Sequence, residues 1–78
     1  MSDGKDRVLQ ILSRVTKRAA AEIKPEHDLK GDLDVGSAEA LDLFATLEDE
    51  LGLEISEVEA ARLRTVGDVL AFVRTKKG

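Results

Sequence analysis

The sequence has no cysteine, tryptophan or tyrosine, and only one proline, one histidine and two phenylalanines among its 78 residues. The absence of cysteine excludes disulfide bonds, zinc–thiolate sites and any reaction whose nucleophile is a cysteine of this chain. Two phenylalanines do not make a platform for stacking nucleic-acid bases. We therefore expect no nucleic-acid partner, and several classes of enzyme are excluded.

Long hydrophobic runs are also absent. No apolar stretch approaches the ~20 residues that a membrane-spanning helix requires, and the segment Met1–Lys5 is polar, unlike a signal peptide. We therefore expect no membrane insertion and a cytoplasmic location. A chain of this length has room for one small core, so we expect residues 1–78 to form a single, monomeric domain.

The formal net charge of −4 conceals an uneven distribution. Between Asp28 and Glu59 there are eleven acidic residues and one basic residue, Lys30, which gives −10, whereas the rest of the chain has 5 acidic and 11 basic residues, which gives +6. An acidic segment repels nucleic acid and attracts proteins with exposed lysine and arginine. The simpler interpretation, which charge alone favours, is that these acids only keep a small protein in solution.

Hydrophobic periodicity predicts two longer helices. The first contains Val8, Ile11, Leu12 and Val15. It could extend through the alanines that end at residue 21, because alanine has the highest helix propensity, but it must end before the proline at residue 25. The second is predicted from Gly36–Ser37 to about Leu51, with Gly52 as the left-handed residue after it.

Two capping signatures predict the remaining helices. Ser56 with Glu59 precedes a short third helix, and Thr65 with Asp68 precedes a fourth. The segment between residues 25 and 36 lacks a helical period, so we predict a long loop held to the core by four apolar side chains, Ile23, Leu29, Leu33 and Val35. The predicted fold class is all-α, a four-helix bundle with a long loop between helices 1 and 2 and a short helix 3.

Catalytic and metal-binding patterns are missing. His27 is the only histidine and has no assignable nucleophile as a partner. The stretch from Asp32 to Gly36 is similar to the start of a calcium loop, but it lacks the third acidic ligand, and Leu43 occupies the position of the bidentate glutamate. We therefore predict no catalytic residue and no metal site.

Ser37 is the most informative polar residue. By itself it is a serine at a helix start, where such side chains usually accept a hydrogen bond from an orphan backbone N–H group. A helix N-terminus also favours a phosphodiester, because its free N–H groups point outward. The small neighbours Gly36 and Ala38 would let another protein approach the hydroxyl closely.

The stretch from Leu33 to Glu39, continued by 41–43 and 47–52, resembles the region around the modified serine of acyl carrier proteins. Residues 53–56, 59–60 and 65–68 resemble that family's third and fourth helices, without a gap from Arg7 to Val73. The resemblance implies that a phosphopantetheinyl transferase (the holo-synthase) moves 4′-phosphopantetheine from coenzyme A onto Ser37. The thiol of this covalent arm would then carry an acyl group as a thioester.

The resemblance also assigns roles to two groups of side chains. The acidic residues Glu39, Asp42, Glu48 and Asp49 would bind basic patches on acyl-loading and acyl-transfer enzymes of fatty-acid, lipid or polyketide-type biosynthesis. The core-facing residues Leu43, Leu47, Ile55, Leu63 and Val69 would shelter the acyl chain, an assignment that is compatible with ordinary core packing. The chain itself would not be an enzyme.

Three positions depart from the family's usual pattern. Gly36 and Ala38 stand where the family usually has aspartate and leucine, and Lys30 stands where an apolar residue is commoner. We interpret the chain as a discrete, specialised carrier outside bulk fatty-acid synthesis. One alternative is a carrier-like interaction module without a prosthetic group. A second, less favoured because the chain lacks catalytic residues, is a small hydrolase or metal-dependent enzyme. The acyl group and the pathway are left open.

Overall fold

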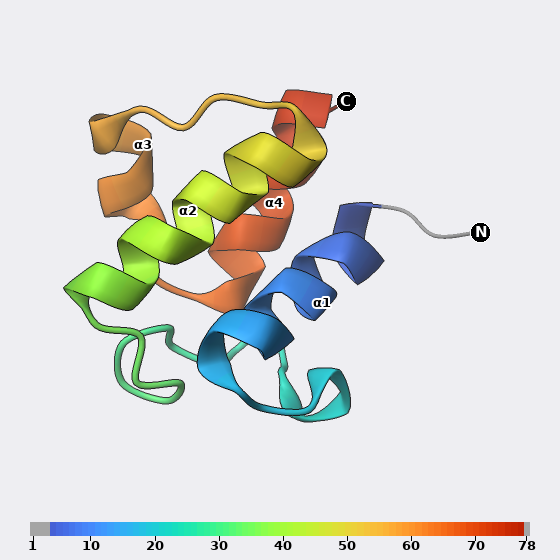
Figure 1. The fold of residues 1–78 in the computed structure, drawn as a ribbon, viewed down its shortest axis with the longest axis vertical. Helices are drawn as coiled ribbons and strands as arrows, with labels where there is room; N and C mark the ends of the chain where they lie inside the picture. The colour runs from blue at the N-terminus through green and yellow to red at the C-terminus, as the bar shows by residue number, and fades with distance from the viewer. Residues whose placement is uncertain (1–3, 78) are drawn as a thin grey trace.

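The structure, a computed structural model, describes residues 4–77. It contains α1 (Gly4–Thr16), a short 3-10 helix η1 (Ala20–Glu22), α2 (Ser37–Leu51), α3 (Glu57–Arg62) and α4 (Val66–Lys77) (Figure 1). No β-strand occurs within these residues, only an isolated bridge between Asp28 and Thr65. The predicted all-α fold, with its long loop and short third helix, is confirmed.

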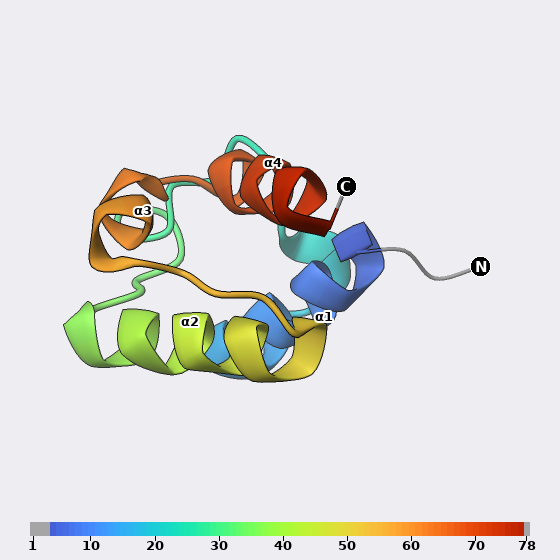
Figure 2. The same ribbon diagram turned by 90° about the horizontal axis from the view of Figure 1, so that it is seen from above.

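Helix α1 is the element that joins the bundle, since it packs against both α2 and α4. Seen from above, α2 and α4 lie on opposite sides of the molecule, and α3 lies at the end away from α1 (Figure 2). The core between them is apolar, with no buried polar side chain among the described residues. Fifteen side chains form it: Val8, Ile11, Leu12, Ile23, Leu29, Leu33, Val35, Leu43, Leu47, Leu51, Leu53, Leu63, Val66, Val69 and Val73.

The long loop is held as the sequence predicts. Ile23, Leu29, Leu33 and Val35 are each at most 5% exposed, so they fix the segment that leads into α2. Backbone hydrogen bonds also join this loop to the α3–α4 connection, from Leu29 N to Arg64 O at 2.8 Å and from Val66 N to His27 O at 3.0 Å. The loop therefore forms a defined wall of the molecule.

The possible extension of the first helix to residue 21 is wrong. Helix α1 ends at Thr16, and Lys17 adopts the left-handed conformation with φ of 61°. The Thr16 hydroxyl donates to Leu12 O at 2.7 Å, and the Ser13 hydroxyl donates to Arg18 O. A straight continuation would direct the chain away from the core, whereas this turn lets Ile23 be buried, so tertiary packing overrides the helix propensity of the alanines.

The caps predicted after α2 and before α3 and α4 are present. Gly52 has φ of 65° after α2, and Ser56 and Glu59 form a reciprocal capping box before α3. Asp68 makes the equivalent bonds with Thr65 before α4, at 3.1 and 3.2 Å. These bonds also lower the pKa values of the two capping carboxylates. The Ser56 N–H lowers the pKa of Glu59, helped by Lys76, and the Arg64 and Thr65 N–H groups lower the pKa of Asp68.

Candidate functional site

Ser37 is the first residue of α2, and Gly36, with extended backbone at φ −80° and ψ −174°, is the capping residue before it. The expectation that the Ser37 side chain caps the helix is therefore wrong. Within residues 4–77 its hydroxyl forms no hydrogen bond, and the residue is exposed. The hydroxyl is consequently free of any structural role and accessible to another protein.

The start of α2 is also a favourable environment for an anion. The first bond within the helix runs from Ala40 N to Gly36 O at 2.8 Å, so the N–H groups of Ser37, Ala38 and Glu39 have no acceptor inside the helix. Such groups, together with the helix dipole, stabilise negative charge. The Glu39 carboxylate lies close by, since its Oε1 would be 2.8 Å from a Cβ atom placed on Gly36.

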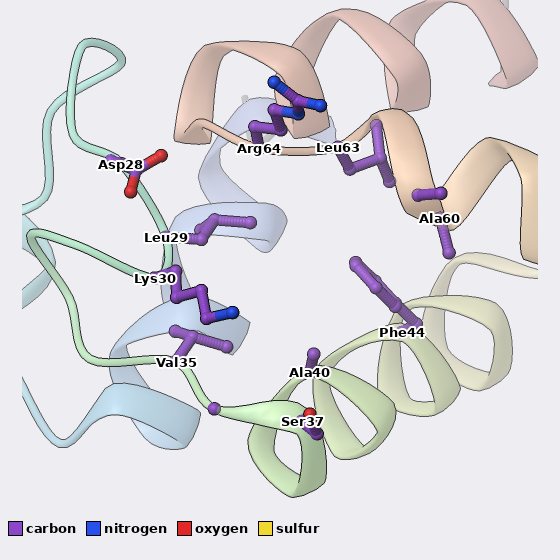
Figure 3. Close-up of a pocket in the computed structure, with 12 residues that line it drawn as sticks. Asp28, Leu29, Lys30, Val35, Ser37, Ala40, Phe44, Ala60, Leu63 and Arg64 are labelled. Atoms are coloured by element: carbon purple, nitrogen blue, oxygen red, sulfur yellow. The ribbon is translucent and has the colours of Figure 1, made fainter.

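A pocket of about 390 Å³ opens beside Ser37 (Figure 3). Ser37, Ala40 and Phe44 line it from α2, Ala60 and Leu63 from α3 and its end, and Leu29 and Val35 from the loop. Its full lining consists of Asp28, Leu29, Lys30, Val35, Gly36, Ser37, Ala40, Phe44, Ala60, Ala61, Leu63 and Arg64. The candidate attachment residue therefore stands at the edge of a hollow lined by both apolar and charged residues.

The residues predicted to shelter an acyl chain fall into two groups. Leu63 lines the pocket, whereas Leu43, Leu47 and Val69 are fully buried in the core and Ile55 is partly buried outside the lining. Their role toward an acyl chain stays a prediction. The pocket residues that sequence reasoning missed are chiefly Val35, Ala40, Phe44 and Ala60. Phe44 and Ala40 could have been predicted from the hydrophobic pattern, because both lie at the partly buried edge of the apolar face of α2.

Three of the four predicted recognition acids are exposed on α2, namely Glu39, Asp42 and Asp49. Glu48 differs, because its carboxylate accepts the Ile55 N–H at 2.9 Å and so holds the connection between α2 and α3. Leu41, which the sequence analysis did not single out, is 73% exposed between Glu39 and Asp42. The outer surface of α2 therefore combines negative charge with one large exposed apolar side chain.

The remaining polar candidates have local structural roles. His27 Nδ1 accepts the Lys24 N–H at 3.1 Å, and the carboxylates of Asp28 and Asp32 accept backbone N–H groups of Gly31 and Asp28. In the described part of the chain no group of three histidine, cysteine or acidic residues is placed to hold a metal ion. No helix there is long and apolar enough to cross a membrane.

Comparisons with known proteins agree with this geometry. The family model described as "Phosphopantetheine attachment site" matches residues 6–73. The acyl carrier protein of Chlamydia caviae is 39% identical over 59 residues, which cover 76% of this chain and 77% of that protein. The meromycolate extension acyl carrier protein of Mycobacterium tuberculosis is 36% identical over 67 residues, which cover 86% of this chain and 58% of that protein.

A solved structure extends the likeness to three dimensions. The acyl carrier protein from Enterococcus faecalis matches with a TM-score of 0.74 at 26% identity, covering 92% of this chain and 96% of that one. The family match includes Ser37, the start of α2 and all of the pocket lining. By family model, sequence identity and fold together, this chain belongs to the acyl carrier protein family, whose members carry acyl groups on covalently attached 4′-phosphopantetheine.

Proposed function

We propose that Ser37 is the attachment residue for 4′-phosphopantetheine and that the chain is a carrier without catalytic activity of its own. The observation on which this depends most is the exposed Ser37 hydroxyl, which has no hydrogen bond in the described structure although it stands at a helix start. A phosphopantetheinyl transferase is the partner that this role requires. When bound, the arm supplies a thiol that this cysteine-free chain lacks.

The residues around Ser37 fit such a group. Ser37 Oγ would form the new bond to phosphorus while its proton passes to the transferase and adenosine 3′,5′-bisphosphate leaves. The N–H groups at the start of α2 are oriented to stabilise the resulting negative charge. The adjoining pocket offers apolar contacts from Val35, Phe44 and Leu63. Shelter of a longer chain by Leu43, Leu47, Ile55 and Val69 would require this pocket to deepen into the core.

We propose that partner enzymes dock on the outer surface of α2. Glu39, Asp42 and Asp49 are exposed there, so each would form only weak, salt-sensitive pairs with basic groups of a partner. Leu41, also exposed on α2, could add an apolar contact to a docked partner. Such a surface suits rapid encounters with several enzymes in turn. As part of the same proposal, the chain acts in the cytoplasm as one monomeric carrier domain. It has no nucleic-acid or membrane partner.

Intact mass spectrometry tests the attachment residue. Wild-type protein and the Ser37→Ala variant are incubated with coenzyme A and a phosphopantetheinyl transferase, and the modified peptide is then mapped. We expect the mass of the arm on wild-type protein only, at Ser37. Modification of Ser37→Ala, or mapping to Ser2, Ser13 or Ser56, would refute the assignment. A wild-type chain that no transferase modifies would favour the unmodified interaction module.

A further inference from the structure

Asp34, three residues before Ser37, adopts the left-handed backbone conformation with φ of 56°. Leu33 and Val35 on either side of it are 4% and 5% exposed, so both neighbours are anchored in the core. Glycine takes up a positive φ without steric cost, whereas a residue with a Cβ atom does not. The backbone at residue 34 therefore favours glycine over aspartate.

The side chain of Asp34 has no role in folding that would offset this preference. Two other acids of the loop, Asp28 and Asp32, accept the backbone N–H groups of Gly31 and Asp28. Within residues 4–77 the contact of the Asp34 carboxylate is an ion pair with Arg18 at 3.7 Å. The Asp34 side chain is 85% exposed, and exposed ion pairs contribute little to stability. Folding therefore does not explain a carboxylate at residue 34.

Asp34 lies within the area that an enzyme acting on Ser37 has to cover. Three residues of chain span at most about 11 Å, and the loop runs directly into the start of α2 (Figure 1). A protein–protein interface of standard size buries about 800 Å² on each partner, the area of a circle of about 16 Å radius. An interface centred on Ser37 therefore extends as far as Asp34.

We propose that Asp34 is a recognition residue for the phosphopantetheinyl transferase, whose basic groups bind its carboxylate in place of Arg18. The proposal rests on the function proposed for Ser37. The transferase binds coenzyme A, whose phosphates carry several negative charges, so we expect lysine and arginine side chains around its active site. The pair between Asp34 and Arg18 is exposed and too long for a direct hydrogen bond, so a cation of the partner can replace Arg18 at little cost.

Two changes of Asp34 test the proposal. Asp34→Asn keeps the size of the side chain and tolerates the left-handed conformation but removes the charge. Asp34→Gly removes the side chain altogether. With coenzyme A and a transferase that modifies the wild-type chain, we expect kcat/KM, followed by intact mass, to fall about two- to fivefold in both variants. The effect should be mainly on KM, because a binding contact is lost. Modification of Asp34→Asn at the wild-type rate would overturn the inference.

Two controls separate recognition from folding and from net charge. Asp34→Gly should be at least as stable in urea as the wild type, because glycine suits φ of 56°, so its slower modification would not result from unfolding. Glu26→Gln removes another exposed acid of the same loop and should be modified at the wild-type rate. A loss in Glu26→Gln equal to that in Asp34→Asn would show that net charge governs the rate, and would overturn the role of Asp34.

Arg18→Gln distinguishes direct recognition from positioning of the loop. If the transferase binds the Asp34 carboxylate, removing Arg18 removes a competitor, and kcat/KM should stay at or above the wild-type value. Slower modification of Arg18→Gln, by the factor found for Asp34→Asn, would show that the ion pair only positions the loop, and would overturn the inference.

The outcomes also separate this inference from the function on which it rests. A wild-type chain that gains no arm at Ser37 refutes the proposed function. A wild-type chain that gains the arm, with Asp34→Asn modified equally fast, refutes only the role of Asp34.

Discussion

Restoring the family's usual neighbours of Ser37, with the double change Gly36→Asp and Ala38→Leu, should speed modification by a transferase that acts on fatty-acid carriers. Gly36 has an extended backbone that any residue adopts. The obstacle to a side chain is Glu39 Oε1, which would lie 2.8 Å from a new Cβ atom. Because this atom is the end of a flexible, exposed side chain, Glu39 can swing away at little cost.

The expected gain follows from two contacts. Ala38 is exposed, and extending it to leucine adds apolar area that, at ~25 cal/mol per Å², contributes about 1 kcal/mol or more when a transferase covers it. The new carboxylate at residue 36 adds about 0.2–1 kcal/mol as a rim ion pair. Together they predict roughly a tenfold increase in kcat/KM, with most of the effect on recognition rather than on chemistry.

The assay is a time course of mass conversion for wild-type and doubly changed protein at equal concentration, below KM. A control with Gly36→Asn and Ala38→Leu retains a capping side chain of similar size but removes the charge, so it separates helix capping from ion pairing. Equal rates for wild-type and doubly changed protein would show that residues 36 and 38 do not govern recognition. The interpretation as a specialised carrier would then lose its main support.

Four further outcomes are expected. Ser37→Ala should change the free energy of unfolding by no more than about 0.5 kcal/mol in urea denaturation, because Ser37 does not cap α2; a loss above about 1 kcal/mol would contradict this. Asp42→Lys should slow acyl loading several-fold, as added salt should for the wild type, and leave stability nearly unchanged. Glu48→Lys should lower stability by about 1–2 kcal/mol, because it removes the acceptor of the Ile55 N–H; equal stabilities of the two variants would refute this distinction. Since the pKa of Glu59 is lowered in the fold by its bonds to Ser56 and Lys76, its contribution is complete above the ordinary value of 4.5 and is lost as the pH falls through the lower folded pKa. Glu59→Gln should therefore be less stable than wild type at pH 7 and equally stable in acid, and a constant gap across that range would contradict the assignment.

Elements fixed by short-range chemistry were predictable from the sequence. The starts of α3 and α4 follow from Ser56 and Thr65, each paired with an acid three residues later, and the end of α2 follows from Gly52. These signals lie within one turn of the residues that they order, so no knowledge of the remaining fold is needed. The buried loop side chains were predictable because few other apolar residues lie in that segment.

Features that depend on packing between distant segments were not predictable. The end of α1 at Thr16 results from burying Ile23 in a core that includes α2 and α4. The pocket is formed by a loop, by α2 and by α3, and its wall is set by the bond from Leu29 to Arg64 across the fold. The hydrophobic periodicity of a single helix does not show which distant segments will line a pocket together. Likewise, the position of Ser37 after the cap rather than at it differs by a single residue, which a capping pattern does not distinguish.

The structure also bears on whether the acidic segment only aids solubility. Its ion pairs with the basic parts of the chain are those of Asp34 with Arg18, Glu50 with Arg7 and Arg14, and Glu59 with Lys76. Within residues 4–77 none of the exposed acids Glu39, Asp42 and Asp49 is in an ion pair. The chain has 12 basic residues, so this surface is unpaired because of where they lie rather than because they are scarce. Because these acids are exposed and unpaired, they are available to a partner's lysines and arginines, which supports the proposed docking role of α2.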